Sequence, residues 1–428
     1  MVKTRIKIAV LGCGTVGTQF IKHFNLKRSS IKKKTGIDFF ITKVVDRNRN
    51  KKNIFPSIYT PNTEEVISSG DIDIVVELMG GIEPAYTFIK KAISGGKSIV
   101  TANKALLSEK GKELFSLAEK HKVYVGFEAS VASAIPIVKA LTESFIGNNI
   151  VKLMAILNGT TNYILTQMSL YKGNFPEALS KAQKLGYAEA NPTLDIQGLD
   201  TVHKLSILSW LAFNKYVAWK NIFTEGIEKI DAMDINFAGD FGYRIKLLAI
   251  AKKHKNGLEL RVHPTFLPSY HPLASVEDVY NAIYMEGDMM GKSLMYGEGA
   301  GGNAAASAAI ADVVDIGKKI IGDKTSPFVS IYENEKLPII PMESINTRYY
   351  FRFTVPDKPG VLAMITDVLG KNEISIASVI QKEENKNYDV PVVILTHTAT
   401  EYAVQKAIKE INRLSIVKIP TVLIRVEQ

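Results

Sequence analysis

The segment IKIAVLGCGTVG, residues 6–17, decides the fold of the first part of the chain. Its apolar first half has the length and β-branched content of a strand, and the residues after it continue with helical spacing. The turn between them contains Gly12, Gly14, Thr15, Val16 and Gly17. Gly12 permits the tight turn, Gly14 lets the backbone approach a pyrophosphate, and Gly17 lets the helix pack on the strand. This order predicts a dinucleotide-binding site, with the phosphates at the positive end of the helix dipole.

The next predicted strand, 39–45, ends in Asp46 and Arg47, and this pair bears on the choice of cofactor. In dinucleotide-binding folds an acidic residue here binds the adenosine ribose and favours NAD, whereas an arginine accommodates the 2′-phosphate of NADP. Both residue types are present. Because Lys51 and Lys52 lie close to Arg47 in the sequence, we expect a phosphate pocket and NADP as the cofactor, with NAD as the alternative.

Further strands are predicted at 73–78 and 98–101, with a helix at 84–94 between them. Alternating strands and helices form a parallel, doubly wound α/β sheet of the Rossmann type. Ligands bind at the carboxyl ends of the strands in such sheets. Thr101 and Lys104 lie at one of these ends, so we expect both at the edge of the cofactor site.

Composition and charge exclude several other classes of protein. The chain has 428 residues, which is enough for two or three domains, and Cys13 is the only cysteine, so no intrachain disulfide can form. No apolar run is long enough to cross a bilayer and the first residues lack the features of a signal peptide, so we expect a cytoplasmic protein without a membrane partner. The net charge is +10. The basic residues are spread along the chain without a nucleic-acid-binding motif, so we expect no nucleic-acid partner.

A loop followed by a helix at about 199–213 carries the strongest catalytic signal. Asp200 and Lys204 are four residues apart and therefore share one face of the helix. A solvated surface ion pair is the ordinary interpretation of such a pair. Leu208 and Leu211 continue the same face, however, and predict that the pair is partly buried. A partly desolvated lysine has a lowered pKa and can exchange a proton near neutral pH.

The last part of the chain has the pattern of a small α+β domain. The predicted elements are a strand at 349–355, a helix at 361–369, strands at 374–381 and 390–397, a helix at 401–414 and a strand at 417–426. This βαββαβ order is the ferredoxin-like arrangement. Before it, residues 323–347 are irregular and contain three prolines, which is typical of a linker.

Several segments together resemble the homoserine dehydrogenase family. They are DIDIVVELMGG (71–81), TANKALLS (101–108), FEASVASAIPIV (127–138), ILNGTTNYIL (156–165) and LGYAEANPTLDIQGLDTVHKL (185–205). The resemblance covers essentially the whole chain. It implies a reversible, NAD(P)-dependent interconversion of L-aspartate 4-semialdehyde and L-homoserine in threonine and methionine biosynthesis.

The resemblance also implies roles for individual residues. Lys204 matches the acid/base residue of the family, Asp200 lies beside it, and Lys104 matches a second essential lysine. Glu189 and Asp195 match carboxylates of the substrate site, with Glu189 as the ligand of the substrate amino group, and Asp200 is also expected to contact the substrate. Gly186 and Tyr187 belong to the same substrate loop. Gly301 and Gly302 begin an Ala-rich segment. It resembles the segment with which the chain of family members re-enters the nucleotide-binding domain and borders the cofactor.

Residues 128–136, EASVASAIP, resemble the family's monovalent-cation loop. The implied ligands of a sodium-like ion are Glu128 and the backbone carbonyls of Val131, Ser133 and Ile135, all hard oxygen donors. Members of the family usually have glycines where this chain has Ser133 and Ala134. We therefore expect the loop to depart from the family's conformation.

The turn DKPGVL, 357–362, resembles the ACT domain, an allosteric amino-acid-binding module that usually works in pairs. Asp357, Gly360 and Val361 are the expected effector contacts, and threonine is the expected inhibitor. A pairing domain without a ligand is the alternative. The resemblance implies a homodimer or homotetramer. The expected organisation is a nucleotide domain (1–131 with about 299–322), a catalytic and dimerisation domain (132–298), a linker (323–347) and a regulatory domain (348–428).

Two other functions are alternatives to this one. Aspartate semialdehyde dehydrogenase handles the same aldehyde but needs a cysteine nucleophile, and Cys13 lies inside the phosphate turn, where it is poorly placed for attack. A catalytically inactive sensor of nucleotides and amino acids is the second alternative. Reduction of aspartate semialdehyde, followed through NADPH absorbance, separates that alternative from an active enzyme.

Overall fold

The computed structural model describes residues 4–322, 336–381 and 389–427 of the chain. They divide into two compact units. The first contains Met1–Ile150, His203–Asn221 and Gly287–Glu335, and the second contains Val151–Val202, Ile222–Glu286 and Lys336–Gln428. The domain limits drawn from the sequence stay a prediction, and most of the expected linker, residues 323–335, lies outside the described residues.

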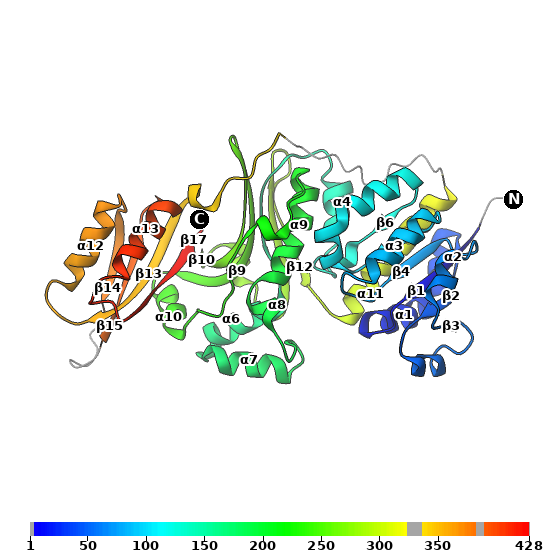
Figure 1. Ribbon diagram of the computed structural model, residues 1–428, viewed down its shortest axis with the longest axis horizontal. Coiled ribbons are helices and arrows are strands. Elements are labelled where there is room, and N and C mark those ends of the chain that lie inside the picture. The colour runs from blue at the N-terminus through cyan, green and yellow to red at the C-terminus, as the bar shows by residue number, and fades with distance from the viewer. Residues whose placement is uncertain (1–3, 323–335, 382–388, 428) are drawn as a thin grey trace. The chain divides into compact units, whose positions relative to one another are not determined.

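The first unit is built on a six-stranded parallel sheet (Figure 1). Its strands are β1 (Arg5–Leu11), β2 (Asp38–Val45), β3 (Tyr59–Thr60), β4 (Ile74–Glu77), β5 (Ser98–Thr101) and β6 (Val125–Gly126), in the order β3-β2-β1-β4-β5-β6. The order reverses between β1 and β4, which is the point where doubly wound sheets bind dinucleotides. The Rossmann-type fold expected from the sequence is confirmed. The limits of its expected strands differ from the observed ones by no more than one residue.

Helices cover both faces of this sheet. They are α1 (Thr15–Thr35) and α11 (Gly302–Ile321) on one face, and α2 (Thr63–Ser68), α3 (Ala85–Ser94) and α4 (Lys104–His121) on the other. Phe20 and Phe24 of α1 pack with Ile316 of α11 against β1 and β2. Ile89 of α3 and Leu114 of α4 fill the opposite core. Both faces are therefore buried, which explains the continuously apolar sequence of the central strands.

Shorter elements complete the first unit. They are η1 (Arg49–Asn53), η2 (Glu128–Ser130), α5 (Ile137–Lys139), η3 (Ala140–Ser144), η4 (Trp219–Asn221) and β12 (Gly291–Glu298). Helix α9 (Leu199–Phe213) begins in the second unit and continues into the first. Its limits agree with the helix expected at about 199–213.

The second unit has a mixed sheet with the strand order β11-β7-β9-β10-β17-β13-β15-β14. Its strands are β7 (Ile150–Ile156), β8 (Phe223–Thr224), β9 (Tyr243–His254), β10 (Gly257–Pro268), β11 (Tyr280–Gly287), β13 (Asn346–Pro356), β14 (Ile376–Gln381), β15 (Asp389–Thr396), β16 (Ala399–Thr400) and β17 (Ile419–Val426). Its helices are α6 (Gly159–Tyr171), α7 (Phe175–Lys184), α8 (Thr193–Ile196), α10 (Ala232–Asp240), η5 (Pro272–Ser275), η6 (Met342–Ser344), α12 (Val361–Lys371) and α13 (Glu401–Ile411).

Residues 346–426 have the expected βαββαβ order, from β13 to β17, with the short β16 added before α13. Strand β17 lies beside β13 in antiparallel pairing and also beside β10 in parallel pairing, where Thr265 faces Arg425. The sheet of this C-terminal domain is therefore continuous with β9 and β10. The sequence pattern predicted the domain but not this continuity.

Buried charges hold the join between β10 and β17. Arg261 is 1% exposed and forms ion pairs with Glu259 and with Glu427, the residue after β17. Arg425 donates to Glu401 of α13 and, at 2.9 Å, to Glu225 after β8. A buried arginine is tolerated when several carboxylates accept hydrogen bonds from its N–H groups.

Among the described residues, no helix is long and apolar enough to cross a membrane.

Candidate active site

The phosphate turn has the geometry that the glycine spacing predicts. Gly12 has φ +96°, and a Cβ atom there would lie 2.7 Å from the carbonyl oxygen of Leu78. A Cβ on Gly17 would lie 2.0 Å from the Gly12 oxygen, so this helix can approach the turn only with glycine in place. A Cβ on Gly14 would meet nothing within 4 Å, which leaves open space where a pyrophosphate is expected.

Helix α1 begins at Thr15 and Val16, with Gly14 as its N-cap and no side chain capping it. Its first N–H groups therefore point to the open side of the turn, as an anion-binding helix terminus requires. Gly301 has φ +120° and Gly302 begins α11, where a Cβ would lie 3.2 Å from the side chains of Thr15 and Gln19. The Ala-rich α11 thus lies against the start of α1.

The residue after β2 is hydrogen-bonded to the phosphate turn. Asp46 accepts a hydrogen bond from the backbone N–H of Cys13 at 2.7 Å and from that of Asn48 at 2.8 Å. Arg47, next in sequence, is exposed. Burial raises the pKa of the Cys13 thiol to about 12, so this thiol is a poor nucleophile.

Two of the predicted residues lie where β5 ends. Thr101 is its last residue and is buried, while Lys104 is the first residue of α4 and is partly exposed. Asn103 caps α4 by accepting the N–H of Leu106 at 3.1 Å. The cap thus fixes the backbone position of Lys104 at the start of α4.

The structure joins two of the predicted substrate carboxylates through a residue that the sequence analysis missed. Asn158 follows β7 and caps α6, since its Oδ1 accepts the N–H of Thr161 at 2.8 Å. Its Nδ2 donates to Asp195 at 2.7 Å and to Asp200 at 2.9 Å. Asn158 was visible only as part of a matched segment, because nothing in a sequence indicates which loops an amide will connect.

Asp200 and Lys204 are buried on α9, each with 6% of its surface exposed. Leu208, one turn further along, is completely buried, and Leu211 is partly buried. The prediction that this pair lies at the end of an apolar stripe is confirmed. A solvated surface ion pair, the alternative, is wrong. Burial favours the neutral amine of a lysine and so suits proton exchange.

The remaining substrate-loop residues lie between α7 and α8 and are exposed. Gly186 has φ +77°, and the Tyr187 ring lies 5.1 Å from that of Tyr163. The Tyr187 carbonyl accepts a hydrogen bond from Thr160 at 2.6 Å. Glu189 is exposed, with its backbone carbonyl accepting from Gln183. Thr160, like Asn158, was missed as a site residue. Asp195, Asp200 and the start of α6 are brought together, whereas the Glu189 side chain is not joined to them by any bond in the described residues.

The expected cation loop contains a buried carboxylate whose oxygens accept backbone N–H groups. Glu128 is 3% exposed and accepts from Val138 at 2.8 Å and Lys139 at 3.0 Å. Its own N–H donates to Asp312 at 2.9 Å. Burial raises the pKa of Glu128 and raises that of Asp312 to about 7. Within the described residues, neither carboxylate forms an ion pair.

The other implied ligands lie in a tight turn. Val131 and Ile135 are buried, and Ser133 is partly exposed with its hydroxyl bonded to the Ala129 carbonyl. The Ile135 carbonyl already accepts the Ile137 N–H at 2.7 Å. Among the described residues there is no cluster of three acidic, histidine or cysteine side chains that could hold a metal ion. Any cation here would therefore depend mainly on backbone oxygens.

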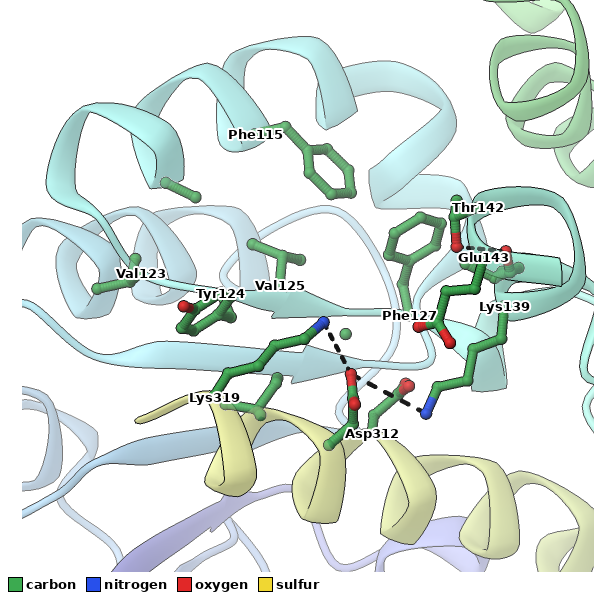
Figure 2. A pocket seen from close by; sticks show the side chains of 15 residues that line it. Phe115, Val123, Tyr124, Val125, Phe127, Lys139, Thr142, Glu143, Asp312 and Lys319 are labelled. Carbon is green, nitrogen blue, oxygen red and sulfur yellow. Dashed lines mark hydrogen bonds and ion pairs between the residues drawn. The ribbon is translucent and has the colours of Figure 1, made fainter. Parts of the chain in front are cut away.

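A cavity of about 60 Å³ borders this segment. Figure 2 shows Asp312 and Lys319 extending from α11 toward the strand that carries Val125, with Lys139 and Glu143 across from them. Asp315 forms an ion pair with Lys319 at 2.9 Å. The cavity has room for only a few water molecules and is lined by both signs of charge, so it does not have the volume of a substrate site.

The expected effector residues lie at the first turn of the C-terminal domain. Gly360 has φ +88° and is the N-cap of α12, which begins at Val361. Asp357 accepts a hydrogen bond from Gln381 of β14 at 3.1 Å. The turn thus presents an uncapped helix terminus, as an amino-acid carboxylate requires.

Three family models match the chain. They are the homoserine dehydrogenase NAD-binding domain at residues 12–128, homoserine dehydrogenase at 136–314 and the ACT domain at 349–414. The first two cover the segments that carry the phosphate turn and the Asp200–Lys204 pair.

Curated relatives and solved structures agree with these matches. Homoserine dehydrogenases of Helicobacter pylori and Neisseria gonorrhoeae are 42% and 41% identical over 99% of this chain, covering 100% and 98% of those proteins. The crystal structure of a homoserine dehydrogenase from Thiobacillus denitrificans is 40% identical, with a TM-score of 0.93 over 99% of this chain and 98% of that one. A hyperthermophilic archaeal homoserine dehydrogenase in complex with NADPH covers 73% of this chain and 97% of that one, with a TM-score of 0.63 and 27% identity. The chain therefore belongs to the homoserine dehydrogenase family and is an NAD(P)-dependent oxidoreductase with a C-terminal ACT domain.

Proposed function

We propose that this chain interconverts L-homoserine and L-aspartate 4-semialdehyde, with Lys204 as the acid/base residue. The burial of Lys204 and Asp200 on one turn of α9 carries the proposal. Reduction of the aldehyde needs a proton at the carbonyl oxygen, and oxidation of the alcohol needs that proton removed. A bound nicotinamide supplies or accepts the hydride. A buried lysine beside a carboxylate can pass the proton in both directions.

Other residues orient the substrate in this proposal. Lys104 adds positive charge near the reacting oxygen or the substrate carboxylate, which also lowers the pKa of a neighbouring ammonium group. Asp195 and Glu189 bind the substrate ammonium group. Asp200 holds the Lys204 side chain. The support is the bonding of Asp195 and Asp200 to a single amide nitrogen, which keeps the two carboxylates close together.

Purified enzyme tests the proposal through NADPH absorbance with aspartate semialdehyde as substrate. Lys204→Ala is expected to lower turnover by about 10² or more, as loss of a general acid/base does. Lys184→Ala, at an exposed position in the last turn of α7, is the matched control and should keep normal turnover. Near-normal turnover of Lys204→Ala would remove this lysine from the role. A wild-type chain inert toward the aldehyde would support the inactive sensor instead.

NADP is the cofactor that we propose. The support is the exposed Arg47 at the end of β2, followed by Lys51 and Lys52 of η1, together with the NADPH-bound archaeal relative. Arg47→Ala should lower kcat/KM for NADPH more than for NADH, while Lys33→Ala, exposed on α1, should change neither. A strong preference for NAD that survives Arg47→Ala would refute the proposal.

A sodium-like cation at the loop 128–135 is also proposed. The buried carboxylates of Glu128 and Asp312, which have no ion-pair partner among the described residues, fit a bound positive charge. Replacing sodium by a large organic cation should lower the melting temperature of the wild type more than that of Glu128→Gln. Equal melting temperatures of the wild type in both salts would contradict the cation site.

Regulation by threonine is proposed for the C-terminal domain, with Asp357, Gly360 and Val361 at the effector site, in a homodimer or homotetramer. The uncapped α12 terminus after Gly360 supports binding of a carboxylate. Threonine should inhibit the full chain, and Asp357→Ala should weaken the inhibition without changing basal turnover. Indifference of the wild type to threonine would refute this role, and sedimentation analysis gives the oligomeric state.

A further inference from the structure

Glu77 is a completely buried carboxylate at the last position of β4, in the centre of the parallel sheet. Burial raises its pKa. No lysine or arginine among the described residues forms an ion pair with it. An ionised carboxylate in such a place is costly unless hydrogen-bond donors satisfy it. The donors that surround Glu77 all come from the two loops that follow β4 and β5.

One carboxylate oxygen holds the loop after β4. Oε1 of Glu77 accepts the backbone N–H groups of Met79 at 2.8 Å and of Gly80 at 3.2 Å. Residue 78 of the same loop contacts the phosphate turn, since a Cβ atom on Gly12 would lie 2.7 Å from the Leu78 oxygen. Glu77 therefore fixes the segment against which the phosphate turn packs.

The other carboxylate oxygen holds the loop after β5. Oε2 of Glu77 accepts the hydroxyl of Thr101, its partner in the strand register, at 2.6 Å. The Thr101 hydroxyl in turn accepts the N–H of Asn103 at 3.0 Å, and the Asn103 amide donates to the Gly81 carbonyl at 2.5 Å. The hydrogen bonds thus form a closed ring that connects both loops. Asn103 also caps α4, whose first residue is Lys104.

Only a carboxylate satisfies every member of this ring. Glutamine could accept the Met79 and Gly80 N–H groups through its oxygen, but its amide would then face the Thr101 hydroxyl as a donor. The hydroxyl would accept from both the amide and Asn103, and its own proton would have no acceptor. A buried donor without a partner is expensive, so the ring would shift.

We propose that Glu77 is a positioning residue for the reaction: it fixes the loop Met79–Gly81 and, through Thr101 and Asn103, the helix terminus that carries Lys104. The inference rests on the proposed role of Lys104. Glu77 itself contacts neither substrate nor cofactor in this proposal. It acts through two loops at the carboxyl edge of the sheet, where dinucleotides bind in this fold.

Glu77→Gln tests the inference, with Ile99→Val as the control because Ile99 is completely buried in β5 beside the ring but outside it. Displacing a reacting group by about 1 Å can cost about 10²-fold in rate, so we expect kcat of Glu77→Gln to fall by about that factor. The pH profile of kcat should shift as well, because the surroundings of Lys104 change. Ile99→Val should lower the melting temperature while kcat and KM stay normal. A Glu77→Gln enzyme that is only less heat-stable, with normal kcat, KM and pH profile, would show a purely structural role and overturn the inference.

Asn103→Ser is the second variant, for the case that Glu77→Gln does not fold. Serine keeps an acceptor for the α4 cap but removes the donor to Gly81. We expect kcat to fall, and normal kinetic constants would overturn the inference. Lys104→Ala distinguishes the role of Lys104 itself from the positioning role of Glu77. Normal turnover of Lys104→Ala refutes the role of that lysine and the inference with it, whereas an impaired Lys104→Ala beside a normal Asn103→Ser refutes the positioning role alone.

Discussion

Asn158→Asp is the substitution for which the structure gives the clearest quantitative expectation. It keeps the size of the side chain and the cap of α6, but replaces the amide nitrogen by an oxygen. That oxygen would lie 2.7 Å from an Asp195 oxygen and 2.9 Å from an Asp200 oxygen, if nothing moved. Two unit charges at about 2.8 Å repel by about 6 kcal/mol at an effective dielectric constant of about 20. The new carboxyl group therefore takes up a proton on folding.

The expected destabilisation depends on pH. Holding an aspartic acid in its neutral form costs about 1.4 kcal/mol for each pH unit above its ordinary pKa of about 3.9. Because the pKa in the folded variant is raised above that in the unfolded chain, the difference in unfolding free energy from the wild type is small near pH 4. It then grows as the pH rises. Between pH 6 and pH 8 it should increase by about 2.7 kcal/mol, at about 1.4 kcal/mol per unit.

Denaturant unfolding of both proteins at several pH values measures this difference. Asn174→Asp is the matched control, because Asn174 also caps a helix, α7, but is exposed, with its oxygen 3.0 Å from the Glu177 nitrogen. Aspartate is as good a cap as asparagine, so the control should show no slope between pH 6 and pH 8. A pH-independent difference for Asn158→Asp would refute the placement of its amide between the Asp195 and Asp200 carboxyl groups.

Three further changes give distinct results. Gly17→Ala would place a Cβ 2.0 Å from the Gly12 oxygen, and overpacking of about 1–3 kcal/mol should raise the Kd for NADPH, measured by fluorescence, about fivefold to a hundredfold; an unchanged Kd would count against the tight turn. Glu189→Gln should mainly raise KM for homoserine, and a fall in kcat alone would exclude the proposed ammonium contact. For Asp312 without a bound cation, burial raises the pKa from 3.8 to about 7. In sodium-free buffer the wild type should therefore lose stability relative to Asp312→Asn as the pH rises from about 4 to about 7, by about 4 kcal/mol at 1.4 kcal/mol per unit. If the difference in unfolding free energy between the wild type and Asp312→Asn were the same at pH 5 and pH 8, that burial would be contradicted.

The sequence predicted the local elements well where one physical signal dominated. The glycine spacing at 12–17, the apolar β1 and the apolar face of α9 depend on residues close together in the chain, and all three are confirmed. The burial of Lys204 could be predicted because helical periodicity alone places it on the same face as Leu208.

Contacts between distant segments were out of reach. The bond from Asn158 to Asp200 spans 42 residues, and the one from Glu77 to Thr101 spans 24. An asparagine or a glutamate in a loop has the same local signal whether it connects two loops or points to solvent. The pairing of β17 with β10, which fuses the C-terminal domain to the sheet before it, likewise has no signature in either strand.

The amino-acid sequence by itself determined the dinucleotide turn, the succession of strands and helices, and the family, because periodicity, glycine conformation and matched motifs are properties of short segments. The tertiary structure alone decided which polar side chains satisfy one another at the carboxyl ends of the strands. Burial makes each unsatisfied donor or acceptor costly, so the partners are selected by the packing of the whole fold and not by the residues adjacent in the chain.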